Sequence, residues 1–438
     1  MSIASLTVVL ILSVFLIFVL GLPVAFSLSG VAMIYASLLW GTDALGIIFY
    51  AAFGTMTNFV IVAIPLFILM GFILQNSGVA DRVYDLMHKW MGSVNGGLAI
   101  GTVWICTLMA AMVGVAGPAI ITMSVLSFPA MMSRKYDRRI AIGSIMAGGT
   151  LGILIPPSIP MILYASVTSL SVGKMFAAAI VPGLILSFLY TVYIGIRCAR
   201  NWKLGPALPL EERASWREKV IALRGTVLPI LLILGVLGSI FLGIATPTEA
   251  AAVGVAGAVI CALAHRRFSW SMIKSACYDT VRLSGMVMWI LIGAACFSRF
   301  YFGMGAADLV KGAIMTAGLN RWVVLILMEL SLVVLGMILE GFAIVLIAGP
   351  IYGPVIISMG FNPLWFGILF MLHLQVALLT PPYGFALFYM KGALYDKHVP
   401  ISAIWRSALP FIPIQLLVIV LVMVFPELSL WLPNLLLD

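Results

Sequence analysis

The stretch Gly148-Gly-Thr-Leu-Gly-Ile-Leu-Ile-Pro-Pro-Ser158 lies inside an apolar segment, residues 140–164, that is long enough to cross a membrane. Its prolines lack amide donors, and the glycines ahead of them permit an unwound backbone. A second stretch, Leu379-Thr-Pro-Pro-Tyr-Gly384, repeats the Pro-Pro pair within the apolar segment 364–390. One proline kink alone would most simply be a bend without a ligand. Two kinks of the same form instead predict two broken helices at a binding site, because unwound backbone at membrane depth is tolerated only beside protein or water.

The composition requires lipid as the solvent for nearly the whole chain. Of its 438 residues, 63% are hydrophobic and 9% are charged, whereas a typical soluble domain is roughly 25% charged. We therefore predict an all-α integral membrane protein with about ten spanning helices. They are expected near residues 6–20, 24–39, 59–74, 140–164, 176–196, 226–243, 250–264, 283–301, 364–390 and 408–425.

Two further apolar stretches, residues 98–132 and 322–358, are interrupted in the middle. The first contains Gly114-Val-Ala-Gly-Pro118 and the second contains Glu340-Gly-Phe-Ala343. Each half of the first stretch is shorter than the about 20 residues that a full crossing needs. We predict two re-entrant helical hairpins, and two ordinary helices joined by a tight turn remain the alternative for each.

The order of elements repeats along the chain. Pro23 and Gly30 recur as Pro247 and Gly254, and the Pro-Pro pair of the first broken helix recurs in the second. The sequence thus predicts a first repeat at residues 1–197, a polar connector at 198–224 and a second repeat at 225–438. Five crossings in each half make the repeats inverted, which is typical of ion-coupled transporters.

The basic residues show which side of the membrane each loop occupies. Of 24 Lys and Arg residues, 20 fall in five loops: 82–89, 134–139, 197–224, 266–282 and 391–406. These loops, including the connector, are expected to be cytoplasmic, which places both termini in the periplasm. The net charge of +9 is then explained by the excess of Lys and Arg in the cytoplasmic loops. No nucleic-acid partner is needed to explain it.

Pairing each hairpin tip with the broken helix of its own half predicts one cation site per half, with the substrate between them. Carbonyl oxygens of unwound backbone can ligate a sodium ion. The N-terminus of a nearby helix can bind an anionic substrate. Glu340 either ligates a cation or only supports the hairpin tip. Coupling to protons is the less favoured hypothesis, because a proton relay needs several Asp, Glu or His side chains at successive depths. Only His373 lies near the broken helix that is paired with Glu340. The sodium sites are expected at Gly114, Ala116, Gly117, Gly149, Gly152, Pro156, Glu340, Gly341, Thr380 and Pro382, and the substrate site at Pro118, Pro157, Ser158, Thr380, Pro381 and Tyr383.

No enzymatic motif is present in the sequence. It contains no Gly-rich loop followed by Lys-Ser or Lys-Thr, and no His-Glu-x-x-His segment. The five cysteines form no Cys-x-x-Cys pair and no Cys/His spacing suited to zinc. We therefore expect a transporter and not an enzyme, with no organic cofactor.

The Gly148–Ser158 string and Thr380-Pro-Pro-Tyr-Gly384 resemble the large membrane (M) subunit of tripartite ATP-independent periplasmic (TRAP) transporters. Pro65-Leu-Phe-Ile-Leu-Met-Gly71, Ser77-Gly-Val-Ala-Asp81 and Met337-Ile-Leu-Glu340 extend the resemblance along the chain. It implies an elevator-type secondary transporter in the bacterial inner membrane, driven by two or more sodium ions. It also implies a separate small membrane (Q) subunit, a soluble periplasmic substrate-binding (P) subunit and an organic-acid substrate.

The chain departs from the family at the first hairpin tip, where Val115 and Ala116 replace residues that often carry hydroxyl groups. Only backbone groups of these two residues can then ligate a cation. We expect the substrate pocket to differ from that of other members of the family. A self-sufficient ion-coupled carrier or antiporter of similar architecture, needing no binding protein, is the alternative interpretation.

Overall fold

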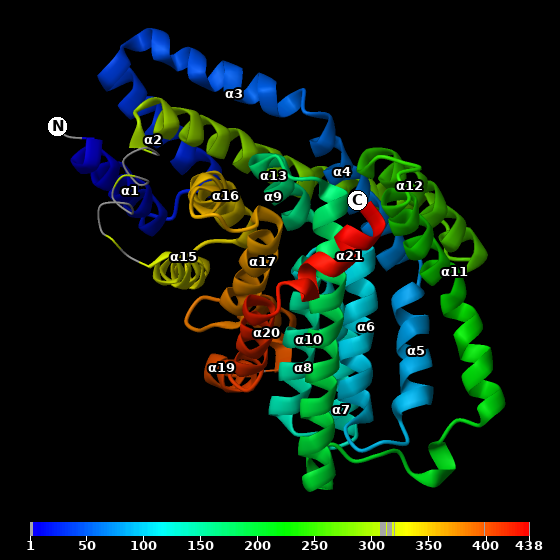
Figure 1. The fold of residues 1–438 in the computed structure, drawn as a ribbon. Helices are drawn as coiled ribbons and strands as arrows, with labels where there is room; N and C mark the ends of the chain where they lie inside the picture. The colour runs from blue at the N-terminus through cyan, green and yellow to red at the C-terminus, as the bar shows by residue number, and fades with distance from the viewer. Residues whose placement is uncertain (1–2, 307–311, 313–317, 319, 398, 438) are drawn as a thin grey trace.

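The computed structural model describes residues 3–306, 312, 318, 320–397 and 399–437, and these fold into helices packed around a buried apolar core (Figure 1). Lys311, one of the four basic residues outside the five loops, lies outside this part of the chain. The α-helices of the first half are α1 (Ile3–Val19), α2 (Val24–Trp40), α3 (Gly46–Met56), α4 (Ala63–Asn76), α5 (Val79–Met91), α6 (Gly97–Val113), α7 (Ala116–Ser133), α8 (Arg138–Thr150), α9 (Ile159–Thr168) and α10 (Val172–Arg200).

The second half begins after a short linker at residues 201–215. Its α-helices are α11 (Trp216–Phe241), α12 (Pro247–Ala264), α13 (Trp270–Gly303), α15 (Arg321–Gly336), α16 (Gly341–Ser358), α17 (Pro363–Leu379), α18 (Phe385–Ala393), α19 (Ile401–Ala408), α20 (Ile412–Val424) and α21 (Glu427–Leu437). Short 3-10 turns occupy Thr42–Leu45, Phe59–Val62, Leu151–Ile153, Trp202–Leu204, Leu210–Glu212 and Tyr395–Lys397.

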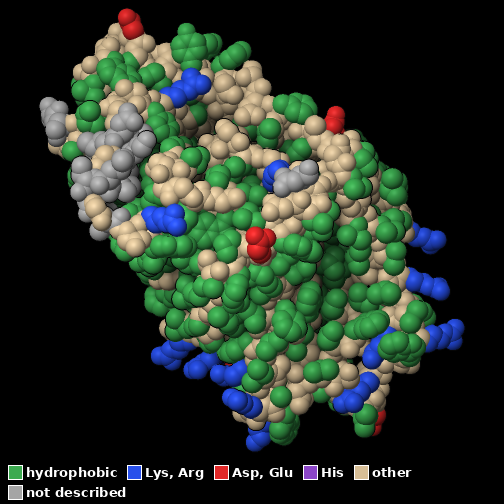
Figure 2. Space-filling model, in the orientation of Figure 1, with side chains coloured by type: hydrophobic (Ala, Val, Ile, Leu, Met, Phe, Trp, Pro, Cys, Tyr) green, Lys and Arg blue, Asp and Glu red, His purple; other side chains and the backbone are tan. Residues whose placement is uncertain are grey.

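Eight helical segments in the described ranges are long and apolar enough to cross a membrane, against the ten spans expected. The difference arises partly because α1 and α2 are only 17 residues long. The two Pro-Pro segments are also divided into shorter helices, as the sequence predicts. Hydrophobic side chains cover the flanks of the molecule, and Lys and Arg side chains gather towards one end (Figure 2).

Local sequence signals account for the helix boundaries. Ser215 with Glu218, and Thr246 with Glu249, form capping boxes that start α11 and α12. Asp137 starts α8 by accepting hydrogen bonds from the amides of Arg139 and Ile140. These caps satisfy amides that helix geometry leaves without partners.

Both predicted hairpins have a helix on each side of their break. α6 ends at Val113, Gly114 adopts a positive φ of 71°, and α7 begins at Ala116. In the second hairpin, α15 ends at Gly336 and α16 begins at Gly341. These four helices have 16 to 18 residues, which makes them about 24–27 Å long, somewhat less than the roughly 30 Å hydrocarbon core of a bilayer. The two 18-residue helices, α7 and α16, are among the eight segments counted as long enough to cross.

The two halves exchange equivalent packing partners. α7 of the first hairpin packs on α18, and α16 of the second hairpin packs on α9. Likewise, α2 packs on α13, and α12 packs on α4. This is the pattern that two repeats related by a pseudo-two-fold axis would produce.

One helix differs between the halves. α3 starts at Gly46 and α13 starts at Trp270, at the same offset of 224 residues that relates Pro23 to Pro247. In the first half the chain breaks at Thr57 and Asn58, between α3 and α4, whereas α13 continues unbroken for 34 residues. This continuity brings the first turns of α13 into the site described below.

The linker between the halves is held by hydrogen bonds and is not a free tether. The Gly96 amide donates to Gly205 O at 2.7 Å, and the Leu208 amide donates to Gly92 O at 2.7 Å. Glu212 forms an ion pair with Arg134 at the end of α7. The hydrogen bond from the Arg134 guanidinium lowers the pKa of the exposed Glu212 carboxyl.

The five cysteines are all free thiols. Four of them, Cys106, Cys198, Cys261 and Cys296, are buried, whereas Cys277 on α13 is exposed.

Candidate functional site

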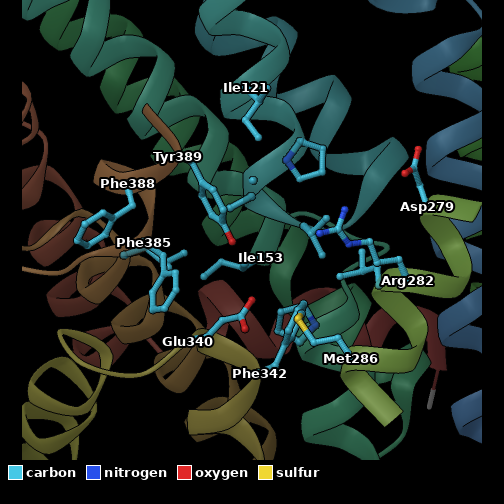
Figure 3. A pocket seen from close by; sticks show the side chains of 18 of the residues that line it. Ile121, Ile153, Asp279, Arg282, Met286, Glu340, Phe342, Phe385, Phe388 and Tyr389 are labelled. Carbon is cyan, nitrogen blue, oxygen red and sulfur yellow. The ribbon is translucent and has the colours of Figure 1, made fainter. Parts of the chain in front are cut away.

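A cavity of about 790 Å³ lies where the two hairpin tips face α4, α13 and α18 (Figure 3). It combines residues that lie far apart in the sequence but meet through helix packing. Its wall consists of Phe72, Gln75, Val115, Ala116, Gly117, Pro118, Ile121, Ile153, Pro160, Asp279, Arg282, Leu283, Met286, Glu340, Gly341, Phe342, Leu378, Phe385, Phe388 and Tyr389.

Two helices begin at the cavity wall. α7 starts at Ala116 and α16 starts at Gly341, and both residues line the cavity. The first amides of a helix have no intrahelical acceptor and carry the positive end of the helix dipole. Both starts therefore favour negative charge in the cavity.

The first hairpin tip is packed tightly against its broken helix. The Ile159 amide donates to Gly114 O at 3.1 Å. A Cβ on Gly152 would lie 2.6 Å from Val115 O, and one on Gly114 would lie 2.5 Å from Pro157 O. These glycines let backbone segments approach so closely that carbonyl oxygens gather at the tip.

In the second half, a Cβ on Gly384 would collide with Leu378 O, so the broken helix is tightly packed there as well. Leu378, at the end of α17, lines the cavity together with Glu340 and Gly341. Glu340 is the N-cap residue of α16, but its side chain forms no capping hydrogen bond. In Figure 3 the Glu340 carboxylate and the Tyr389 hydroxyl point into the same space from opposite walls.

Arg282 corrects the sequence analysis, which placed it in a cytoplasmic loop ahead of a span starting at residue 283. The helix in fact begins at Trp270, so that Arg282 lies in its fourth turn and lines the cavity. The side chain extends from α13 towards the space between the tips (Figure 3). Hydropathy alone misses this residue because the first turns of α13 are polar.

The structure divides the predicted site residues into two groups. Ala116, Gly117, Pro118, Glu340 and Gly341 line the cavity. The others lie outside its wall: Gly114, Gly149, Gly152, Pro156, Pro157, Ser158, Thr380, Pro381, Pro382 and Tyr383.

The hydroxyl groups of this second group are directed elsewhere. Ser158 Oγ donates to Ile153 O at 2.7 Å, and Thr380 Oγ1 donates to Val376 O at 2.7 Å. Tyr383 is 58% exposed, and its ring stacks on Phe388. The Pro156-Pro157 and Pro381-Pro382 peptide bonds are both cis.

A buried ionisable pair joins the second hairpin to the broken helix that follows it, apart from the cavity. Glu329 of α15 and His373 of α17 are 3% and 6% exposed, and Glu329 Oε2 lies 3.8 Å from His373 Nε2. His373 Nδ1 lies 2.9 Å from Leu369 O. The sequence suggested that Glu340 is the acidic residue near His373, whereas in the structure that residue is Glu329.

Comparisons with known proteins agree with this fold. The structure resembles the YdaH transporter of Alcanivorax borkumensis with a TM-score of 0.64, at 15% sequence identity, over 96% of this chain and 98% of that one. At this identity the likeness shows the fold alone. It confirms the prediction of an all-α membrane transporter fold.

Sequence comparison gives the family. The chain is 34% identical over 398 residues to the C4-dicarboxylate TRAP transporter large permease protein DctM of Pseudomonas aeruginosa, covering 91% of each. It is 30% identical over 418 residues to the sialic acid TRAP transporter large permease protein SiaM of Vibrio cholerae, covering 95% of each.

These relatives are transporter permeases, which confirms the expectation of a transporter and not an enzyme. The model of the tripartite ATP-independent periplasmic transporter DctM component matches residues 11–428. The chain therefore belongs to the DctM component family of tripartite ATP-independent periplasmic transporters.

Proposed function

We propose that this chain is the translocating subunit of a binding-protein-dependent system that takes up an organic acid across the bacterial inner membrane together with sodium. One observation carries the proposal: the two hairpin tips and Arg282 meet at a single cavity. The helix starts at Ala116 and Gly341 and the guanidinium all favour an anion there. Organic acids are also the cargo in the names of the Pseudomonas and Vibrio relatives.

Sodium coupling is supported by the backbone at each tip. In the first half, the Pro157 carbonyl lies against Gly114 of the tip, and the Val115 carbonyl of the tip lies against Gly152 of the broken helix. The ligands proposed around this contact are at Gly114, Ala116, Gly117, Gly149, Gly152 and Pro156. In the second half, Glu340, Gly341, Thr380 and Pro382 would supply a carboxylate and backbone oxygens. Hard cations prefer such oxygen ligands, and two sites would carry two or more sodium ions.

The exchange of packing partners between the halves supports inverted repeats at residues 1–197 and 225–438. We propose that the hairpins and broken helices move as one body against a frame that includes α2, α4, α12 and α13, in an elevator motion. The cavity lies between these two groups of helices. Such movement would expose the bound acid to alternate sides of the membrane.

The proposed assembly includes a small membrane subunit and a soluble periplasmic binding protein, as the tripartite family description suggests. The isethionate TRAP transporter permease protein DctMQ of Oleidesulfovibrio alaskensis is 29% identical, and this chain covers 64% of it. That relative extends beyond its match to this chain. We propose that the small membrane subunit is a separate chain. The basic end of the molecule would face the cytoplasm, with the linker there and both termini in the periplasm.

We expect uptake of labelled organic acids into liposomes that contain this chain and its small subunit to require both an inward sodium gradient and the binding protein. Uptake should fall to background when either is removed. Uptake with sodium but without the binding protein would favour the self-sufficient carrier instead. Uptake that is indifferent to sodium would contradict the proposed cation sites.

Replacing Glu340 with glutamine is expected to raise the sodium concentration for half-maximal uptake by about ten-fold or more. The side chain keeps its shape but loses a charge that, near a bound cation, contributes several kcal/mol at an effective dielectric constant of about 20. The measurement is the sodium dependence of initial uptake rates. Glu211→Gln, at an exposed position of the linker, is the matched control, and an unchanged sodium dependence in Glu340→Gln would exclude Glu340 as a ligand.

A further inference from the structure

We propose that the cavity selects monocarboxylates with an apolar body of about the size of an aromatic ring, in preference to C4-dicarboxylates or polyhydroxylated sugar acids. This inference rests on the proposed function and specifies its substrate class. It is carried by the distribution of charge and of aromatic rings over the cavity wall.

The charge of the wall provides for one carboxylate. Arg282 is the one basic side chain among the described residues that line the cavity, and Asp279 and Glu340 are the acidic ones. A carboxylate at Arg282 can form charge-assisted hydrogen bonds with the guanidinium. A second carboxylate at the far end would find no further basic side chain in the described wall, because the sodium ion proposed at Glu340 would only balance the charge of Glu340 itself.

The rest of the wall is apolar. Aromatic rings come from α4, α16 and α18, and aliphatic side chains fill the space between them. The rings are those of Phe72, Phe342, Phe385, Phe388 and Tyr389, and the aliphatic residues are Ile121, Ile153, Leu283, Met286 and Leu378. An apolar ligand body would gain contact with these surfaces and release water from them.

Few polar groups remain for a sugar acid. The Gln75 side-chain amide donates to Thr122 Oγ1 at 2.8 Å and leaves its Oε1 as an acceptor. Tyr389 offers a single hydroxyl, and the two carboxylates of the wall can only accept hydrogen bonds when ionised. A polyol placed against this wall would leave most of its hydroxyl groups without partners, at roughly 1–3 kcal/mol for each buried group. The volume of about 790 Å³ also falls within the range of roughly 300–1,000 Å³ that is typical of pockets for larger organic ligands.

We infer the orientation of such a ligand from the side chains labelled in Figure 3. Arg282 reaches into the cavity from α13, while Phe385 and Phe388 line the wall formed by α18. The carboxylate would face Arg282 and the ring would lie between Phe342 and Phe385. Substrate binding would then join α13 of the frame to α16 and α18 of the moving body.

The test measures binding to the purified chain with its small subunit in nanodiscs, since a binding protein would impose its own selection. The ligands are labelled phenylacetate and 4-hydroxyphenylacetate, compared with succinate and N-acetylneuraminate, all in sodium buffer. We expect both aryl acids to bind at least about ten-fold more tightly than the other two. Arg282→Gln should weaken aryl-acid binding by about ten-fold or more, Arg282→Lys should restore part of the loss, and Lys274→Gln, at an exposed position on the same helix, should not change it.

A second variant separates the apolar contact from the charge. Phe342→Ala should weaken binding of the aryl acids and leave binding of succinate unchanged. Tighter binding of succinate or N-acetylneuraminate to the unmodified complex, or unchanged aryl-acid binding in Arg282→Gln, would overturn the inference while the proposed function stands. Sodium-dependent uptake of no organic acid by the complete three-part system would overturn the proposed function and this inference with it.

Discussion

Gly114→Ala is expected to reduce uptake at least ten-fold. Gly114 has a φ of +71°, a conformation that costs an alanine about 1–2 kcal/mol. In addition, the new Cβ would lie 2.5 Å from Pro157 O, which is backbone and cannot rotate away. The tip of the first hairpin would have to move off its broken helix, and the carbonyl oxygens gathered there would separate. Initial uptake rates at saturating sodium and substrate measure the loss.

Gly360→Ala is the matched control for this variant. Gly360 has a similar φ of +76°, but a Cβ there would meet no atom within 4 Å. Alanine at position 360 is therefore destabilised by the same positive φ but collides with no other atom. Uptake by the Gly360→Ala variant should stay within about two-fold of that of the unmodified protein. Equal losses in the two variants would show that backbone strain, and not the close approach to Pro157, is responsible.

Removing either partner of the Glu329–His373 pair is expected to destabilise the protein by about 2–4 kcal/mol. The contact with Leu369 O requires a proton on His373 Nδ1, since a carbonyl can only accept. His373 Nε2 then faces Glu329 Oε2 at 3.8 Å, within reach of an ion pair but beyond the length of a hydrogen bond.

Glu329→Leu leaves the buried His373 Nε2 without its acidic neighbour, and His373→Leu leaves a buried carboxyl group without the imidazole beside it. The double variant Glu329→Leu/His373→Leu leaves neither group without its partner. Its decrease in the free energy of unfolding should therefore be smaller than the sum of the two single decreases by about 0.5–3 kcal/mol. Unfolding free energies in mild detergent would give all three values. Strictly additive losses would show that the two side chains do not act as a pair.

The sequence predicted the breaks in the helices better than the contacts around them. Gly114 and the two Pro-Pro pairs are local signals, because each residue restricts or frees its own backbone. The structure places helix boundaries at each of these positions. Hairpin tips and broken helices could therefore be located from single residues without knowledge of the packing.

The cavity wall could not be predicted in the same way. Arg282 seemed to be a loop residue because a hydropathy window records the apolar part of α13 and not its polar first turns. Phe72, Phe385 and Tyr389 join the site only through the packing of α4 and α18 around the tips. His373 and Glu329 are separated by 44 positions in the sequence, so that no local pattern connects them.

The distribution of the five thiols makes the chain suitable for optical work. Cys277 is exposed, while Cys106, Cys198, Cys261 and Cys296 are buried. A maleimide dye should therefore react at one position without any cysteine being removed. Cys277 lies on α13 two residues before Asp279 of the cavity wall, so a fluorophore there would report on the mouth of the cavity. A second cysteine introduced on α16 would provide the partner for single-molecule energy transfer between the two groups of helices.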